Sequence, residues 1–436
     1  MNTFREFYSQ LLQDPENCWL TLENPSKQKH ITYNSLYIRI NHYLAYFEKQ
    51  NINSNDIVLI ILKESLDLFA SFIAAIIYGA MPAYYPYPSP KQSKYNFSSI
   101  INHLLRYNKI RMIVGFPEVI QHLQKEINYN EIELISFKDI KNLEEIKIKL
   151  KSNIEENFLQ FSSGTTGAKK GVKISISSLN NQIKSYKKIL DLNDRSKIVS
   201  WLPHYHDMGL ICCMILPLFK KIPIIMMSPF EWVMRPISLL ENIHKHKGTH
   251  VWLPNFSLNH IANNTSEEES SKLDLSSIEK LICCSEPTLF DTVTNFKKKF
   301  SNNKLNPLAF QSCYAMAENT FAVSSTKEKG ILFLNIDYSM MKKKGKIKIV
   351  KNGYRIASVG KPIENNEVRI ISNNKKKLPE NHVGQIEIRS NCLFSEYYNN
   401  PIATKKSFNQ EWFITGDLGF IHNRELYITG RKKELI

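Results

Sequence analysis

The segment at residues 159–175, LQFSSGTTGAKKGVKIS, contains the residue types that can hold a phosphate group. The glycines Gly164 and Gly167 would let backbone N–H groups approach an anion closely, and Lys170 would add a positive charge. The hydroxyl donors of the segment are Ser162, Ser163, Thr165 and Thr166. A P-loop NTPase requires the pattern G-x-x-x-x-G-K-[ST]. Counted from Gly164, the second glycine would fall on Lys169, and counted from Gly167 it would fall on Val172, so the pattern is not met. The segment therefore predicts an anion-binding loop of another kind, with an ordinary flexible turn as the alternative.

Histidines and cysteines could indicate a metal site, but their spacing argues against one. His204 and His206 would point the same way if they lay on a strand. No third ligand is evident, whereas catalytic zinc sites use three protein ligands. A second histidine cluster comprises His244, His246 and His250. A helix end with neighbouring lysines explains it better than a metal site does. The seven cysteines form no C-x-x-C pair, so the chain predicts neither a zinc knuckle nor a disulfide framework.

Length and composition indicate a globular protein of the reducing cytoplasm. The chain has 436 residues, which suits two or three packed units, and 43% of them are hydrophobic. The N-terminus shows no signal peptide, and the most apolar run, residues 68–78, is too short to span a bilayer. The net charge of +16 would suit nucleic acid, an anionic membrane or an acidic protein. The abundance of Lys, Asn and Ile throughout favours a biased genome, and the denser runs at 342–346 and 375–377 are expected to be solvated turns between strands.

Strands and helices alternate over the first part of the chain. Apolar residues at helical spacing predict a helix within residues 31–50, namely Leu36, Ile40, Leu44 and Phe47. Residues 56–62 predict a buried strand, and a helix, a short strand and a proline-rich loop should follow. Further strands are expected at 110–116 and 132–137, and this rhythm predicts parallel β-α-β packing. After about residue 360, alternating strands joined by turn residues predict a smaller β unit.

Five motifs resemble those of the adenylate-forming superfamily, which comprises the acyl-, aryl- and aminoacyl-adenylating enzymes. FSSGTTGAKKGV is similar to its phosphate loop, CCSEP (283–287) to its adenine-side turn, and CYAMAEN (313–319) to its aromatic-to-glutamate block. WFITGDLGF (412–420) resembles the ribose-binding block, and TGRKKELI (429–436) resembles the hinge. Because the five occur in the family order over most of the chain, the chain is identified as a member of this superfamily.

Within the superfamily, the chain most resembles the fatty acyl-AMP ligases. The segments WLPHYHDMGLI, MMSPFEWVMRPISLL and PNFSLNH look like the acyl-site blocks of that subgroup. The interval between Glu318 and Val359 is longer than in related acyl-CoA synthetases, which fits the insertion typical of the subgroup, at about residues 333–354. A long surface loop is the alternative interpretation of this segment.

The resemblance implies an α/β fold with two mixed or parallel sheets sandwiched by helices, plus a smaller distorted β-barrel. The adenylating N-terminal domain would span residues 1–430. It would contain two α/β subdomains in about 1–330, the inserted segment, and a β subdomain in about 355–430. Residues 431–436 would begin a hinge, since the chain stops just past the likely hinge residue Lys433. Family members continue with a mobile C-terminal domain, so we expect this chain to be the large N-terminal module alone.

The resemblance also implies that the substrates of the chain are ATP and a fatty acid, with Mg²⁺ as cofactor. Lys170 and the hydroxyl-rich loop would hold the β- and γ-phosphates, and Glu318 with Thr166 would bind Mg²⁺, a cation that prefers oxygen ligands. Tyr314 would stack on adenine, and Asp417 would accept both ribose hydroxyls. The alternatives are a helix-capping acid for Glu318 and a turn residue for Asp417. The other residues expected on the nucleotide are Gly164, Gly167, Ser285, Glu286, Pro287, Ala315, Met316, Ala317 and Arg431.

On the acyl side, the resemblance places His206 beside the reacting carboxylate. The residues expected to line an acyl tunnel are Trp201, Met208, Gly209, Trp232 and Phe256. Each of the aromatic residues is equally compatible with an ordinary hydrophobic core.

Four positions depart from the family pattern. Ala315 and Cys284 stand where the family has glycines, so each adds a side chain where backbone normally lies against the nucleotide. Cys284 is expected to tighten or tilt the adenine site. His204 and Tyr205 stand where the subgroup usually shows Pro and His.

The expected partners are a fatty acid and, in the full protein, the phosphopantetheine thiol of an acyl carrier protein. Carrier proteins are typically acidic, which fits the basic surface. No recognition helix, zinc finger or aromatic-basic RNA motif is present, so no nucleic-acid partner is expected, and the protein is expected to be a monomer. A fatty acyl-CoA synthetase and a catalytically silent nucleotide or fatty-acid binding module are the alternatives.

Overall fold

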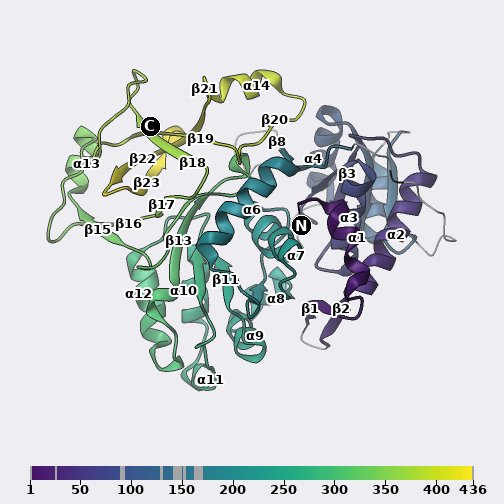
Figure 1. The fold of residues 1–436 in the computed structure, drawn as a ribbon, viewed down its shortest axis with the longest axis horizontal. Helices are drawn as coiled ribbons and strands as arrows, with labels where there is room; N and C mark the ends of the chain where they lie inside the picture. Colours follow the sequence, from purple (N-terminus) through teal and green to yellow (C-terminus); the bar gives the residue numbers. More distant parts are fainter. Residues whose placement is uncertain are drawn as a thin grey trace.

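Two large mixed sheets form the frame of the molecule (Figure 1). The computed structural model describes residues 2–24, 27–88, 94–127, 131–140, 150, 154–161 and 170–434. The first sheet has seven strands in the order β20-β8-β7-β4-β3-β5-β6. Its strands are β3 (Ile57–Ile61), β4 (Met81–Tyr84), β5 (Ile110–Gly115), β6 (Glu133–Ser136), β7 (Asn157–Phe161), β8 (Gly171–Ser175) and β20 (Glu396–Tyr397).

The parallel packing predicted for this first sheet is confirmed. Strand β3 pairs in parallel with β4 and β5, and β6 and β7 extend the parallel set on either side. Strand β8 pairs antiparallel with β7, and β20 pairs antiparallel with β8. Side chains of β3 alternate between two hydrophobic clusters, one on each face, as expected for a strand covered by helices on both sides.

The second sheet has nine strands in the order β17-β14-β13-β12-β11-β9-β10-β1-β2. The strands from β1 to β13 along this order are parallel, and β2, β14 and β17 are antiparallel at the two edges. The central strands are β9 (Ile198–Ser200), β10 (Ile224–Met227), β11 (His250–Leu253), β12 (Lys280–Cys283) and β13 (Phe310–Ala315). The outer strands are β1 (Cys18–Glu23), β2 (Lys29–Thr32), β14 (Ala322–Ser325) and β17 (Lys361–Pro362).

Helices join the two sheets through one continuous hydrophobic core. Helix α3 (Leu66–Tyr78) is buried along most of its length, which explains why it is apolar all round. The Ser65 hydroxyl caps its first turn, and Gly79 ends it with a left-handed φ of 106°. Other helices contributing to this core are α1 (Phe4–Ser9), α2 (Tyr33–Lys49), α6 (Ile176–Leu190), α7 (Leu216–Lys220), α8 (Pro229–Met234), α9 (Ser238–His246), α10 (Asn255–Asn263) and α12 (Phe290–Lys299).

The remaining helices are shorter or lie at the periphery. Helices α4 (Lys94–Tyr107) and α5 (Pro117–Glu126) contribute to the second hydrophobic cluster, on the far face of the first sheet. The others are α11 (Glu267–Ser271), α14 (Pro401–Lys406) and the 3-10 turns η1 (Leu11–Gln13), η3 (Ser301–Asn303), η4 (Pro307–Ala309), η5 (Ala317–Asn319) and η6 (Lys432–Glu434). None of the helices formed by the described residues combines the length and apolarity that crossing a membrane requires.

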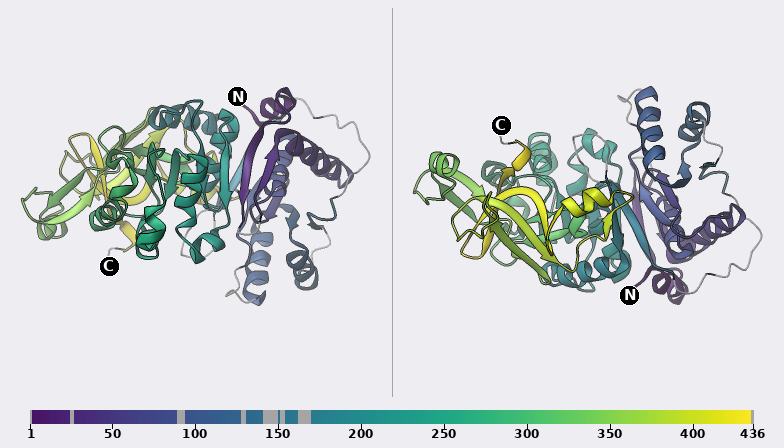
Figure 2. Two further views of the ribbon diagram at one scale, coloured as in Figure 1. Left: turned by 90° about the horizontal axis from the view of Figure 1, so that it is seen from below. Right: turned by 90° about the horizontal axis from the view of Figure 1, so that it is seen from above.

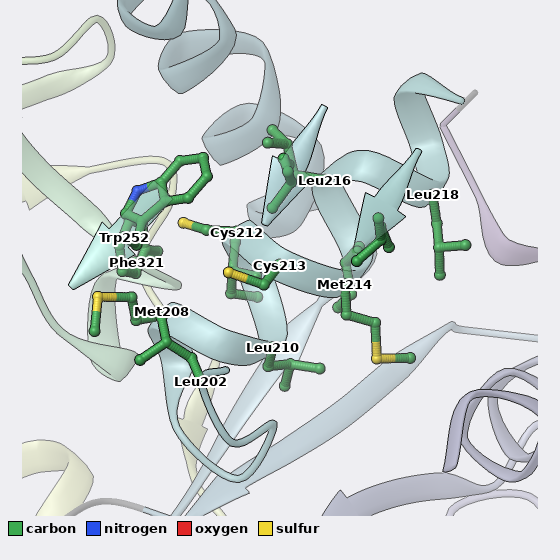
Figure 3. Packing of buried hydrophobic residues seen from close by; sticks show 14 of the residues in the cluster. Leu202, Met208, Leu210, Cys212, Cys213, Met214, Leu216, Leu218, Trp252 and Phe321 are labelled. Carbon is green, nitrogen blue, oxygen red and sulfur yellow. The ribbon is translucent and has the colours of Figure 1, made fainter. Parts of the chain in front are cut away.

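A π-helix, η2 (Met208–Ile215), lies in the middle of the core, and every one of its side chains is buried. Figure 3 shows its cysteines and Met214 among other core residues, including Trp252 and Phe321. A Cβ at Gly209 would lie 2.2 Å from the carbonyl oxygen of Pro203, so only glycine allows this close approach. Short π-helical segments are rare and often occur at functional sites.

A smaller antiparallel sheet is built from five strands between residues 366 and 431, away from the N-terminal strands and helices (Figure 2). It curls into a half-barrel, so the predicted fold class is confirmed. Its strands are β18 (Asn366–Ile371), β19 (Gly384–Ser390), β21 (Phe408–Asn409), β22 (Trp412–His422) and β23 (Glu425–Arg431). The lysine run at 375–377 lies in the turn between β18 and β19, as predicted.

The segment predicted as an insertion forms a separate hairpin with a short helix. Strands β15 (Phe333–Ile336) and β16 (Tyr354–Ala357) pair antiparallel, and helix α13 (Tyr338–Lys344) lies between them in sequence. Lys342, Lys343 and Lys344 occupy the last turn of α13, so the prediction of a turn at this lysine run was wrong. Lysines at a helix C-terminus are favoured by the negative end of the helix dipole.

Candidate functional site

The predicted phosphate loop joins two paired strands. Phe161, the last residue of β7, lies opposite Gly171, the first residue of β8, so the pairing brings the two ends of the loop together. The loop residues Ser162, Ser163, Gly164, Thr165, Thr166 and Gly167 lie outside the described residues, and their predicted roles stay predictions. Lys170 is described and exposed, directly before β8.

Tyr397 links Lys170 to Glu318. The Lys170 ammonium nitrogen lies 4.3 Å from the centroid of the Tyr397 ring, a cation–π contact. The Tyr397 hydroxyl donates a hydrogen bond of 2.7 Å to Oε1 of Glu318. Burial and then the charge of Glu318 raise the pKa of Tyr397, so the phenol keeps its proton and acts as the donor. Lys170, which the sequence predicted to bind phosphate, and Glu318, which it predicted to bind Mg²⁺, thus both contact the Tyr397 side chain.

The sequence analysis missed Tyr397. It lies in the two-residue strand β20 and pairs with Val172 of β8, which places it beside the end of the phosphate loop. Its ring is buried. The sequence around it, SEYYNN, carries two adjacent tyrosines and no pattern that singles one out. Only the long-range pairing of β20 with β8 could have identified it.

The turn that carries Glu318 is held in a strained conformation. Thr320 has a φ of 61°, which is unusual for a β-branched residue. Its hydroxyl donates a 2.7 Å hydrogen bond to the carbonyl of Cys392, and the Phe394 N–H donates one of 2.8 Å to the carbonyl of Glu318. Backbone strain of this kind persists only where the surroundings hold it, and here the segment 392–394 holds the turn of Glu318.

A second carboxylate, Asp207, lies close enough to Glu318 to sense its charge. Burial is the main cause that raises the pKa of Asp207 to about 6, and the negative charge of Glu318 adds to it. The Met208 N–H donates a 2.8 Å hydrogen bond to Asp207 and acts in the opposite direction. Glu318 offers a second carboxylate oxygen beyond the one bonded to Tyr397, and carboxylate oxygens are the ligands that a hard cation prefers. The residues present therefore fit Mg²⁺.

The predicted ribose side brings together residues from three strands. The Tyr314 hydroxyl, on β13, donates a 2.5 Å hydrogen bond to Oδ2 of Asp417 on β22. Nε of Arg431, on β23, lies 3.4 Å from Oδ1 of Asp417. Burial raises the pKa of Asp417, while the Tyr314 hydrogen bond and the Arg431 charge lower it. The hydroxyl of Thr415 accepts a 3.0 Å hydrogen bond from the backbone N–H of Asp417, which orients the turn.

The predicted adenine-side turn is exposed at the end of β12. Ser285, Glu286 and Pro287 are all accessible, and Ser285 has a left-handed φ of 69°. Oε2 of Glu286 accepts a 3.0 Å hydrogen bond from the N–H of Phe256, so this turn contacts the start of α10. Ala315, Met316 and Ala317 connect β13 to the turn of Glu318 and are half-buried.

Cys284 differs from its expected position. Its side chain is fully buried rather than placed at the surface of the turn. It lies against the Cys313 thiol, whose pKa is raised first by burial and then by Cys284. The family glycine is thus replaced by a side chain that packs into the core, behind the turn.

Three of the predicted acyl-site aromatics form one cluster. The Trp201 and Trp232 rings stack with centroids 3.8 Å apart and an interplanar angle of 5°. Phe256 approaches both, at 6.2 Å and 6.1 Å between centroids. Trp201 and Trp232 are buried, whereas Phe256 is 45% exposed and lies at the rim of the cluster. Met208 and Gly209 are buried in the π-helix, and the role of all five in binding an acyl chain stays a prediction.

The two histidines near this cluster lie in a turn and have different environments. Residues 204–206 form no strand, so the condition under which both rings would point the same way is not met. His206 is exposed, and its ring lies 4.9 Å from that of Tyr205. His204 is buried against Phe69 and Tyr84, and burial lowers its pKa to about 3. His204 is therefore neutral near pH 7.

The three histidines of the second cluster have protein partners. Nε2 of His246 lies 2.6 Å from a Glu23 carboxylate oxygen, and Nε2 of His250 lies 2.9 Å from the Leu190 carbonyl. His244 accepts a 3.0 Å hydrogen bond from the N–H of Asp274. Within the described part of the chain, no group of three or more His, Cys, Asp or Glu side chains could hold a metal ion.

Comparisons with known proteins show the family of the chain. The family model described as "AMP-binding enzyme" matches residues 10–398. A medium-chain-fatty-acid–[acyl-carrier-protein] ligase of Moorena producens is 28% identical over 98% of this chain and 76% of its own length. A 4-hydroxyphenylalkanoate adenylyltransferase of Mycobacterium tuberculosis is 30% identical, over 64% of this chain and 48% of its own length. The chain thus spans about three quarters of the first relative and about half of the second.

Solved structures show the same fold over the whole chain. A fatty acid AMP ligase from Legionella pneumophila is 27% identical and has a TM-score of 0.92. The match covers 100% of this chain and 78% of the ligase chain. A fatty acyl-adenylate ligase from L. pneumophila, in complex with acyl adenylate and pyrophosphate, is also 27% identical, over 100% of this chain and 78% of its own, with a TM-score of 0.89. On its motifs, its fold and these matches, the chain belongs to the family of AMP-binding enzymes.

Proposed function

We propose that this chain activates a fatty acid by forming acyl-AMP from ATP. One observation carries the proposal: the five-residue segment from Tyr314 to Glu318 contacts both sides of the site. At one end, Tyr314 bonds to Asp417 of the ribose side. At the other end, Glu318 bonds to Tyr397, which in turn holds Lys170. A nucleotide lying along this segment would place its ribose and its phosphates against residues suited to each.

The reaction joins two anions, so the main task of the site is electrostatic. One carboxylate oxygen of the fatty acid attacks the α-phosphorus of ATP. The bond from that phosphorus to the oxygen bridging the β-phosphate breaks, and pyrophosphate leaves with the electron pair. Charge moves onto the leaving pyrophosphate, and fixed positive groups that meet it there lower the barrier.

The residues of this chain divide that work. Lys170, exposed and held over the Tyr397 ring, is placed to contact the phosphates. Asp417 offers two carboxylate oxygens to the ribose hydroxyls. Glu318 and Asp207 would hold Mg²⁺, which supplies positive charge to the phosphate oxygens when bound. His206 is exposed and so is able to contact the fatty carboxylate.

The acyl chain needs an apolar surface next to this site. The Trp201, Trp232 and Phe256 cluster, with Phe256 at its rim, supplies one. The fatty acid substrate is supported by the relatives, whose names describe fatty-acid ligases. We further propose that the full protein passes the acyl group to the thiol of an acyl carrier protein, as the name of the Moorena relative states for that enzyme. All seven cysteines lie among the described residues and are free, which supports a reducing compartment such as the cytoplasm.

Mass spectrometry of the reaction products tests the proposal. The chain is incubated with ATP, Mg²⁺ and saturated fatty acids of medium and long chain, and pyrophosphate is measured in parallel. We expect acyl-AMP and an equal amount of pyrophosphate, with one range of chain lengths preferred. ATP binding without either product would leave a nucleotide-binding module instead. A second incubation with coenzyme A distinguishes a synthetase, because acyl-CoA would then accumulate.

A further inference from the structure

One exposed segment of the chain carries seven positive charges and no negative one. This basic segment runs from Tyr338 to Arg355 and covers α13, the loop after it and the start of β16. Its cations are Lys342, Lys343, Lys344, Lys346, Lys348, Lys351 and Arg355, and all of them are exposed. Arg355 lies over the Phe290 ring and 4.0 Å from Asp291. The six lysines form no ion pair with any carboxylate in the described chain, so their charge is available to a partner.

The basic segment is held rigidly on the molecule. Ile336, Met341 and Ile356 form a hydrophobic cluster with Phe420 and Tyr427 of the small sheet. Phe333 packs edge-on against Phe290 of α12, at 5.1 Å between ring centroids. The backbone N–H of Ile347 donates to Asn381, and that of Val383 donates to Gly345, each at 2.8 Å. A fixed arrangement of charges loses less entropy on binding than a flexible loop does.

Partly exposed apolar side chains lie among the cations. Tyr338, Ile349 and Tyr354 are 44%, 51% and 48% exposed. The two tyrosine rings lie 5.1 Å apart, and the Lys342 ammonium lies 5.2 Å from the centroid of Tyr338. Aromatic anchors surrounded by a charged rim are typical of protein–protein interfaces.

The basic segment also lies against the strand of the ribose side. Phe420, in the hydrophobic cluster under the segment, follows Asp417 by three residues on β22, which is about 10 Å along a strand. A partner seated on the segment would therefore be near the site where an acyl-adenylate forms.

We propose that the basic segment is the docking surface for an acidic protein, the acyl carrier protein that receives the activated acyl group. This inference rests on the proposed function, which supplies the need for a carrier. Charge complementarity selects an acidic partner, and Tyr338 and Tyr354 supply apolar contact among the cations. Electrostatic complementarity of this kind mainly accelerates association and is weakened by salt.

Two triple variants with equal charge change test the surface. K342Q/K343Q/K344Q removes three charges from the basic segment, and K375Q/K376Q/K377Q removes three from the exposed turn between β18 and β19. The affinity of each variant and of the natural chain for a purified bacterial holo acyl carrier protein is measured at low and at physiological salt. We expect about a tenfold loss at low salt for the first variant and at most about a twofold loss for the second. Tyr354→Ala should also weaken binding, with less dependence on salt.

Two further measurements separate the possible failures. Acyl-AMP formation should be unchanged in all variants, since no changed residue belongs to the nucleotide site, and its absence in the natural chain would overturn the proposed function itself. Equal losses in the two triple variants, or no carrier binding by a chain that does form acyl-AMP, would overturn the docking proposal alone. Vesicles containing phosphatidylglycerol provide the other comparison. If the first variant loses binding to them and keeps its affinity for the carrier protein, the surface binds membranes and the proposal is wrong.

Discussion

The ribose side and the phosphate side of the candidate site balance their charges in different ways. On the ribose side, Asp417 is in direct contact with Tyr314 at 2.5 Å and with Arg431 at 3.4 Å. On the phosphate side, Lys170 and Glu318 both contact Tyr397, the first through the ring and the second through the hydroxyl. No ion pair joins Lys170 to a carboxylate of the described chain.

This difference matches the groups that each side would meet. A ribose is neutral, so a carboxylate whose charge is already met by Arg431 can accept hydroxyl hydrogen bonds without a large net charge. A triphosphate is a polyanion, and a lysine that is held by an aromatic face keeps its full charge for it. Tyr397 therefore positions Lys170 and Glu318 together while keeping them from neutralising each other.

The largest effect should come from Glu318→Gln, which removes the charge that we propose faces Mg²⁺ and the phosphates. We expect kcat/KM for acyl-AMP formation to fall by about 10² to 10³-fold, the range seen when one preorganised electrostatic group is lost. Glu396→Gln is the matched control, because Glu396 precedes Tyr397 and forms only a partly exposed ion pair with Lys173 at 3.4 Å. Equal activity of the two variants in a pyrophosphate-release assay would contradict the assignment of Glu318.

A smaller loss is expected for Asp417→Asn on the ribose side. Loss of a charged hydrogen-bond acceptor costs about 1.5–3 kcal/mol, which corresponds to about a 10- to 100-fold decrease in kcat/KM for ATP. Tyr314→Phe removes the hydrogen bond to Asp417 and leaves the carboxylate, so it should cost less. If both variants lose activity equally, the Tyr314 hydroxyl and not the carboxylate governs this side.

Tyr397→Phe tests the link between Lys170 and Glu318. The variant keeps the ring under Lys170 and loses the 2.7 Å hydrogen bond to Glu318. We expect the Mg²⁺ concentration for half-maximal rate to rise about tenfold, because Glu318 is no longer held in one orientation. Tyr398→Phe, the neighbouring tyrosine, is the control and should leave the Mg²⁺ dependence unchanged. A loss of thermal stability without a change in Mg²⁺ dependence would show a purely structural role for Tyr397.

Local patterns predicted the elements of the fold well because their causes are local. The spacing of Leu36, Ile40 and Leu44 predicted α2, and the β-branched run after Asp56 predicted β3. The condition attached to His204 and His206, that they lie on a strand, is not met. The same-side rule for alternate residues holds only on a strand, and the chain turns at His204.

The sequence supplied candidate site residues but not their contacts. The family resemblance named Tyr314, Glu318 and Asp417, but Tyr314 contacts Asp417 across 103 residues of sequence and Glu318 contacts Tyr397 across 79. The contact with Tyr397 depends on a two-residue strand joining an edge of the first sheet, and no periodicity marks so short a strand. The burial of Cys284 depends likewise on how β12 and β13 pack together.

The smallest expected effect concerns the acid stability of the phosphate side, through Asp207. The folded-state pKa of about 6 lies above the value of about 3.9 for an unfolded chain, so the folded state binds the proton first. Stability contributed by this group therefore increases as the pH falls from about 6 to about 4, and is lost again as the pH rises. Asp207→Asn removes this titrating group. As the pH falls from about 6 to about 4, the free energy of unfolding of the variant should therefore increase by roughly 1–3 kcal/mol less than that of the natural chain. Denaturant unfolding at several pH values between 4 and 7 measures the difference.

The ribose side provides the control. Asp417→Asn should change the pH dependence of stability less, because Tyr314 and Arg431 already oppose the effect of burial on the pKa of Asp417. Identical pH slopes for the natural chain and the Asp207 variant would mean that burial does not raise the pKa of this carboxyl in the folded protein.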